Sequence, residues 1–273
     1  MRILFVGDVM GRAGREALEK YLPKLKVDLN VDVTIVNGEN AAHGRGITEK
    51  FCQQFYELGV DCITTGNHVW DQREILKYIT RDNKLLRPAN FPAPTTPGNG
   101  YHLHELAGGK KILIVNLMCR LFMDAMDDPF KVMEQILFEY KLGHNCDAIF
   151  VDLHGETTSE KMAFGHNFAG RISAVIGTHT HIPTADAHII SGGTAYMSDA
   201  GMCGDYDSVI GIKKAMAIAR FTKKLPGDHF IPASENMTLC GALIVTSEHT
   251  GKAKAIAPVR IGDTLEPSMP INI

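Results

Sequence analysis

Short apolar runs that alternate with helical patterns are the feature that most restricts how this chain can fold. The first part of the chain contains three such pairs, with strand then helix at 3–6 and 15–25, 33–36 and 48–58, and 61–65 and 72–79. This alternation is typical of β-α-β units, whose strands lie side by side in a parallel sheet. The sequence therefore predicts an α/β fold.

The rest of the chain continues the pattern less regularly. It contains predicted strands at 111–117, 148–153, 172–176 and 194–197, and predicted helices at 129–140 and 212–221. Two last strands, 240–246 and 252–261, are joined through His249-Thr250-Gly251 and predict an antiparallel hairpin. The proline-rich segment 87–100 is a connection, and the Met- and Asp-rich loop 118–128 is either a lid or an oligomer contact.

Composition places the chain among ordinary globular enzymes. Of its 273 residues, 45% are hydrophobic and 22% are charged, and the formal net charge is -3 at pH 7. We expect no stable binding of nucleic acid, because the net charge of the chain is negative and no Lys/Arg run is present. No apolar run is long enough for a signal-peptide core or a membrane span, so we expect a cytoplasmic protein without membrane association. The six scattered cysteines contain no C-x-x-C pair and are typical of buried thiols in a reducing compartment.

Five of the apolar runs end in residues that can bind a metal ion. They close with Asp8, with Glu39 and Asn40, with Asn67 and His68, with His154, and with His179 and His181. Taken singly, each residue has an ordinary explanation as a helix cap, a turn former or a loop histidine. The carboxyl ends of strands in an α/β sheet are where ligands bind, however, and five such ends together predict a two-metal hydrolytic site. If the backbone stays extended at 179–181, the i, i+2 spacing puts both imidazoles of that pair on one side.

The same motifs, in the same order, resemble those of the calcineurin-like metallophosphoesterases. They are G-D at 7–8, G-E-N at 38–40, G-N-H at 66–68, H-G at 154–155 and G-T-H-T-H at 177–181. More narrowly, the chain resembles the YmdB-type branch of 2′,3′-cyclic-nucleotide 2′-phosphodiesterases, and the likeness extends to 122–130 and to S-D-A-G-M at 198–202. The resemblance implies one metallophosphoesterase domain over residues 1–273. It also implies a four-layer α-β-β-α sandwich, with two central mixed sheets flanked by helices.

One departure from the superfamily pattern points to the narrower branch. The first motif is usually D-x-H, but here Asp8 is followed by Val9 and Met10. A methionine thioether does not replace an imidazole on a hard divalent metal. Asn40 is the obvious substitute ligand, and Glu39 stands where the wider superfamily has Asp.

The resemblance implies two divalent metal ions that share one bridging carboxylate, Glu39. The first ion would take Asp8, Glu39, Asn40 and His181, and the second would take Glu39, Asn67, His154 and His179. The set contains no thiolate, so its nitrogen and oxygen donors suit several metals. The resemblance favours iron, with manganese as the alternative and zinc left open.

His68 is the candidate general acid, because it lies next to the candidate ligand Asn67 and can protonate a leaving group. The alternative is that His68 only orients a ligand. The resemblance implies that a hydroxide between the metals attacks the phosphorus of a 2′,3′-cyclic nucleotide. His43, Arg45, Asp205 and Tyr206 are weaker candidates for contact with the substrate.

Two other functions stay open at this level. The same metal core also serves phosphomonoesterases and protein phosphatases. A regulatory protein that senses a nucleotide and turns it over slowly is a different class of answer, in which contacts within a homo-oligomer would transmit the signal.

Overall fold

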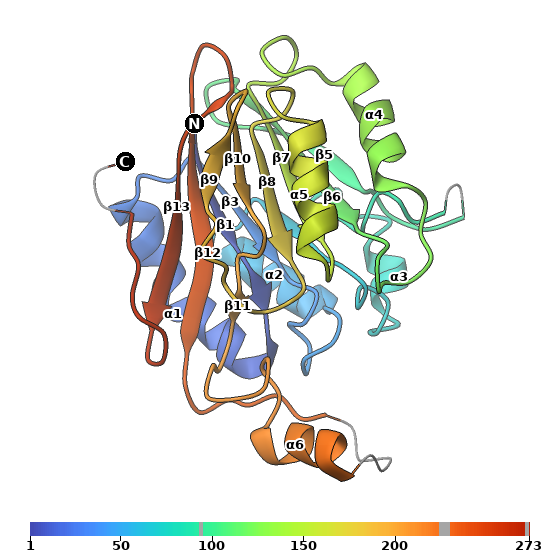
Figure 1. The fold of residues 1–273 in the computed structure, drawn as a ribbon, viewed down its shortest axis with the longest axis vertical. Helices are drawn as coiled ribbons and strands as arrows, with labels where there is room; N and C mark the ends of the chain where they lie inside the picture. Colours follow the sequence, from blue (N-terminus) through green and yellow to red (C-terminus); the bar gives the residue numbers. More distant parts are fainter. Residues whose placement is uncertain (93–94, 224–229, 271–272) are drawn as a thin grey trace.

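A computed structural model of the protein describes residues 1–92, 95–223, 230–270 and 273 (Figure 1). Its first main sheet is mixed, because three parallel strands are followed at one edge by an antiparallel hairpin. In spatial order its strands are β13 (Ala253–Gly262), β12 (Thr238–Thr246), β1 (Arg2–Val6), β3 (Val33–Asn37) and β4 (Cys62–Thr64).

The second main sheet is also mixed. Four parallel strands form its centre, and an antiparallel strand closes each edge. Its order is β5 (Tyr101–Glu105), β6 (Lys111–Met118), β7 (Ala148–His154), β8 (Ala174–Thr178), β10 (Thr194–Met197) and β9 (His188–Ile190). A third, two-stranded sheet pairs β2 (Asp8–Val9) with β11 (Met202–Cys203).

Alternate side chains of the central strands enter different apolar clusters. In β1, Ile3 and Phe5 pack in a cluster with Phe150 of the second sheet, whereas Leu4 and Val6 pack in a cluster with helix side chains. Strands buried on both faces explain why these segments read as continuous apolar runs rather than as alternating ones.

Helices supply the outer partners of both sheets. Side chains of α1 and α2 pack against the first sheet, and side chains of α4 and α5 pack against the second. Helix α6 lies at one end of the molecule, away from the two main sheets (Figure 1). The described helices are α1 (Gly11–Asp28), α2 (Glu49–Glu57), α3 (Ile75–Tyr78), α4 (Pro129–Glu139), α5 (Thr158–Asn167) and α6 (Lys214–Lys223).

The predicted mixed α/β arrangement of two sheets with helices is confirmed, and so is the antiparallel pairing of the last two strands. The helix predicted at 72–79 is reduced to the four residues of α3. Sequence reasoning missed β5, β9 and α5. Helix α5 gave no clear apolar periodicity because its buried face contains Glu160 and Lys161 beside Phe164.

Two expectations drawn from the composition, buried thiols and the absence of a membrane span, can be compared with the described residues. All six cysteines are buried and none forms a disulfide. Among the helices of the described ranges, none has the length and apolar character required to cross a membrane.

The contact between the two sheets should dominate the stability of the fold. Phe5 is fully buried, and its ring centroid lies 5.0 Å from that of Phe150 in the opposite sheet. Phe5→Ala should lower the free energy of unfolding by about 3–5 kcal/mol, because it removes buried apolar area and leaves a cavity. Urea unfolding followed by circular dichroism measures this change. The control is Phe138→Ala on the outer face of α4, where the side chain is 83% exposed, and equal losses in both variants would contradict the expectation.

Candidate metal centre

The predicted site residues come together where strands of the two sheets end. Parallel strands end at the same edge of a sheet, and the packing of the sheets brings both edges together. Asp8 follows β1, Glu39 and Asn40 follow β3, Asn67 and His68 follow β4, His154 ends β7, and His179 and His181 follow β8.

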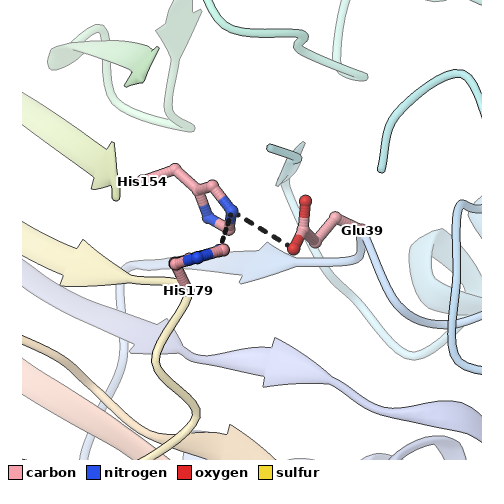
Figure 2. Close-up of side chains that lie close together, drawn as sticks. All are labelled: Glu39, His154 and His179. Carbon is pink, nitrogen blue, oxygen red and sulfur yellow. Dashed lines mark hydrogen bonds and ion pairs between the residues drawn. The ribbon is translucent and has the colours of Figure 1, made fainter. Parts of the chain in front are cut away.

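His154 lies at the centre of one half of the site. Its Nε2 atom lies 2.9 Å from Asn67 Oδ1, 3.1 Å from His179 Nδ1 and 3.2 Å from Glu39 Oε1. Figure 2 shows the side chains of Glu39, His154 and His179 pointing toward one another. Separations near 3 Å are those of neighbouring donor atoms around an ion with bonds of about 2.1 Å.

Outer hydrogen bonds decide which nitrogen of each imidazole faces the centre. His154 Nδ1 lies 2.9 Å from Thr178 Oγ1, and this hydroxyl donates its own proton to Asp152 Oδ1 at 2.7 Å. Oγ1 therefore accepts from His154 Nδ1, which leaves Nε2 turned inward. His179 Nε2 lies 3.2 Å from Glu156 Oε2, which in the same way leaves Nδ1 turned inward. Such partners are what hold the imidazole ligands of metal sites in place.

His181 and Asn40 form the other half of the site. The carbonyl of Ile210 can only accept, so His181 Nδ1 donates to it at 2.8 Å and Nε2 keeps its lone pair. Burial lowers the pKa of His181, which keeps the ring neutral. Asn40 Nδ2 donates to the carbonyl of Gly44 at 3.1 Å, so the Oδ1 atom of Asn40 faces His181 Nε2 at 3.2 Å. Two lone pairs so placed repel each other, and a cation bound to both would turn that repulsion into attraction.

Asp8 offers a buried oxygen without a partner. Its Oδ2 accepts from the backbone N–H of His179 at 3.0 Å, while Oδ1 has no hydrogen-bond partner within the described part of the chain. Burial raises the pKa of Asp8 well above its usual value. A buried carboxylate oxygen that lacks a hydrogen-bond partner is a donor that a divalent cation would satisfy.

The buried charges of the site also shift the pKa values of its other members. Burial acts to raise the pKa of Glu39, but the charge of His154 and its hydrogen bond lower it to about 2. Burial likewise acts to lower the pKa of His154, but Glu39, Asp8 and Asp152 raise it to about 9. His179 has a pKa lowered to about 3 by burial and by the charge of His154. The proton on His154 thus balances the negative charge of Glu39, its partner in a buried ion pair.

His68 stands apart from the inward-facing donor atoms. Its backbone N–H donates to Glu39 Oε2 at 3.1 Å, and its ring Nδ1 lies 2.9 Å from Asp71 Oδ2. The Asp71 carboxylate accepts from Nδ1, so Nε2 is the ring nitrogen left to exchange a proton. Gly66, in the same turn, has no room for a side chain, because a Cβ atom there would overlap Glu39 and His154.

The condition attached to the expectation for 179–181 is not met, because the backbone is not extended there. His179 and His181 have φ values of 103° and 67°, and the two imidazoles face different partners, His154 and Asn40.

Of the four weaker candidates for contact with the substrate, two form hydrogen bonds within the protein and two are exposed. Asp205 is buried, and its carboxylate accepts from the backbone of Glu235 and Asn236. Tyr206 donates from its hydroxyl to the carbonyl of His181 at 3.1 Å. His43 and Arg45 are exposed.

Sequence reasoning missed Asp152, Thr178 and Asp71, which orient the predicted residues. The first had a detectable signal. Asp152 lies two residues before His154 in a strand and therefore shares its face.

Comparison with known proteins gives consistent matches. A sequence profile of the family described as YmdB-like protein matches residues 4–259. The 2′,3′-cyclic-nucleotide 2′-phosphodiesterase of Bacillus subtilis is 45% identical over 263 residues, which cover 96% of this chain and 98% of that one.

Two crystal structures have the same fold. One, of a hypothetical protein from Thermus thermophilus, is 40% identical with a TM-score of 0.89, covering 96% of this chain and 100% of that chain. The other, described as a novel phosphatase from Mycoplasma pneumoniae, is 35% identical with a TM-score of 0.89, covering 99% and 95%. The family resemblance predicted from the motifs is thereby confirmed.

Metal binding should release protons. At pH 7 the imidazole of His154, with a pKa of about 9, carries a proton on each nitrogen, and an ion on Nε2 must displace one of them. Affinity for Mn²⁺ should therefore rise by up to about tenfold per pH unit between pH 6 and pH 8. Isothermal titration calorimetry at pH 7 in two buffers of different ionisation enthalpy counts the released protons. Identical heats in both buffers, with an affinity that does not change with pH, would contradict this prediction.

Proposed function

The chain belongs to the YmdB-like protein family, and from this membership and the site geometry we propose that it is a metal-dependent hydrolase of 2′,3′-cyclic nucleotides. The observation that carries the proposal is the pair of lone-pair donors, His181 Nε2 and Asn40 Oδ1, that face each other beside His154. A relative that is 45% identical over nearly the whole chain is named for this activity. Without a choice of substrate, the relatives support a broader function, that of a phosphodiesterase or phosphatase.

Glu39, His154 and His179 offer ligand atoms that all lie within 4.8 Å of one another, and we assign them and the neighbouring donors to two divalent ions that would share Glu39. One would be held by Asp8, Glu39, Asn40 and His181, and the other by Glu39, Asn67, His154 and His179. When bound, the ions supply a hydroxide nucleophile near neutral pH and stabilise the charge on the phosphoryl oxygens. Iron is the proposed metal, with manganese as the alternative and zinc left open, because the donors are nitrogen and oxygen atoms without a thiolate.

The remaining chemistry belongs to the residues of the chain. Cleavage of the P–O2′ bond leaves an alkoxide that must take up a proton. We assign its delivery to His68 Nε2, because Asp71 accepts from Nδ1 and leaves Nε2 as the ring nitrogen that can transfer a proton. Outer partners such as Thr178 and Glu156 keep the other imidazoles in their metal-binding orientation.

The proposal extends to the wider setting of the enzyme. The three apolar clusters support the four-layer α-β-β-α order of the metallophosphoesterases, with one cluster between the sheets and one under the helices on each side. We also propose a cytoplasmic enzyme that acts on small cyclic nucleotides. The exposed side chains of Leu121 and Phe122 in the 118–128 loop are compatible with either a lid or a contact in a homo-oligomer.

A kinetic panel tests the substrate class. The Mn²⁺- or Fe²⁺-loaded protein should hydrolyse 2′,3′-cyclic AMP with a kcat/KM at least tenfold above those for 3′,5′-cyclic AMP, AMP and a phosphopeptide. Product release is followed by chromatography, which also identifies the cleaved bond from the position of the remaining phosphate. Preference for the phosphopeptide or for AMP would show that the protein is a phosphatase and not a diesterase. Slow turnover of every substrate, together with tight nucleotide binding, would favour the sensing protein.

The role of His68 has its own test. His68→Ala should lower kcat by about 10²- to 10⁴-fold, the usual contribution of a general acid, and should leave the bound metal unchanged. Steady-state kinetics and metal analysis of the same sample measure the two effects. The matched control is His104→Ala, which removes a half-buried imidazole 3.7 Å from the Asp61 carboxylate. A normal kcat with intact metal would exclude His68 as the donor.

A further inference from the structure

A buried ion pair lies next to the candidate metal centre and has no part in the proposed reaction. Lys161 of α5 and Asp199 are each about 1% exposed, and Lys161 Nζ lies 3.2 Å from Asp199 Oδ2. Charged groups are rarely buried so completely, because removing them from water is costly even when they are paired. Such a pair is by itself weak evidence for a gain in stability.

The carboxylate of Asp199 is hydrogen-bonded to the backbone of residues 179–181, here called the histidine loop. Its Oδ2 accepts from the N–H of Thr180 at 2.9 Å, and its Oδ1 accepts from the N–H of Gly201 at 2.9 Å. Thr180 is the residue between His179 and His181. One side chain therefore connects the centre of the H-T-H sequence to segment 198–202, which follows β10.

The histidine loop has a backbone shape that needs such support. His179 and His181 have φ values of 103° and 67°, a region that residues with a Cβ atom seldom occupy. These conformations persist only where surrounding contacts impose them. Here they direct His179 Nδ1 toward His154 and His181 Nε2 toward Asn40.

Segment 198–202 supplies those contacts along its whole length. The N–H of Ala200 donates to the carbonyl of Gly177 at 2.9 Å, and the N–H of Met202 donates to the carbonyl of His181 at 3.2 Å. A Cβ atom on Gly177 would overlap the carbonyl of Ser198, so the two backbones are in direct contact. Lys161 Nζ completes the arrangement by donating to the carbonyl of Thr178 at 2.8 Å.

We propose that Asp199, with its charge balanced by Lys161, is a positioning residue that holds His179 and His181 in the orientation required for metal binding. The inference rests on the proposed function, since it assigns a role relative to the same metal centre. A carboxylate is suited to the position because its two oxygens accept from two separate N–H groups, whereas an asparagine offers only one acceptor oxygen. Lys161 is required because a lone carboxylate at this depth would be destabilising.

Three variants separate positioning from stability: Lys161→Met, Asp199→Asn and the double variant. Lys161→Met should lower Tm because it leaves a buried charge unpaired. The double variant should recover most of that loss, because it leaves no unpaired charge. Its affinity for Mn²⁺ should nevertheless stay at least tenfold below that of the wild type, because the asparagine cannot accept from both Thr180 and Gly201. Calorimetric titration with Mn²⁺ and metal analysis give affinity and stoichiometry.

Leu22→Ala is the matched control for a general loss of stability. Leu22 is a fully buried residue of α1 in the apolar core. This variant should lower Tm and leave the affinity for Mn²⁺ unchanged.

The possible outcomes distinguish the inference from the proposal on which it rests. A wild-type protein that binds no Mn²⁺, Fe²⁺ or Zn²⁺ would overturn the proposed function. A wild type that binds metal, and a double variant that binds it equally well, would show that the ion pair serves stability alone. If the double variant does not fold, Asp199→Asn decides the question, because Lys161 retains its bond to Thr178 there. Wild-type affinity in that variant would overturn the inference.

Discussion

The facing lone pairs at the strand ends are the constraint on which the rest of the site depends. Inward donor atoms of Asn40, His154, His179 and His181 lie about 3 Å apart in pairs, which is favourable only around a proton or a cation. In the metal-free protein, the proton of His154 serves this purpose for Glu39. Of the two proposed ions, the one held by His154 would replace that proton, and the other would satisfy the orphaned oxygen of Asp8. The fold thus assembles donor atoms whose mutual repulsion only a bound cation fully removes.

Buried polar groups outside this set maintain its geometry. Asp152 is fully buried and accepts hydrogen bonds from Asn37, Thr64 and Thr178, of which the last also contacts His154. Burial acts to raise the pKa of Asp152, and these hydrogen bonds oppose the shift. Polar residues at the ends of otherwise apolar strands therefore form a network in which each side chain fixes the orientation of the next.

The sequence predicted that the candidate ligands would lie near one another, for a simple physical reason. Each of them follows or ends a strand, and the parallel order of strands brings such positions to one edge without any knowledge of loop shape. The contacts that shape the loops were not predictable in this way. Asp199 lies 19 residues from Thr180 and Lys161 lies 38 residues from Asp199, so neither pairing leaves a local pattern. Besides Asp152, Asp71 also left a local signal, since it is three residues after His68 in the same turn.

Met10 occupies the position at which the D-x-H pattern expected from the resemblance has a histidine. Its side chain is buried, and it lies against Gly44 and Gly211, where a Cβ atom on either residue would contact it. The carbonyl of Gly44 accepts from Asn40, and Ile210, which precedes Gly211, accepts from His181. Met10 therefore packs beneath both loops that orient the facing pair Asn40 and His181. At the position where the expected D-x-H motif has a histidine, this chain therefore has an apolar side chain that packs against the loops of Asn40 and His181.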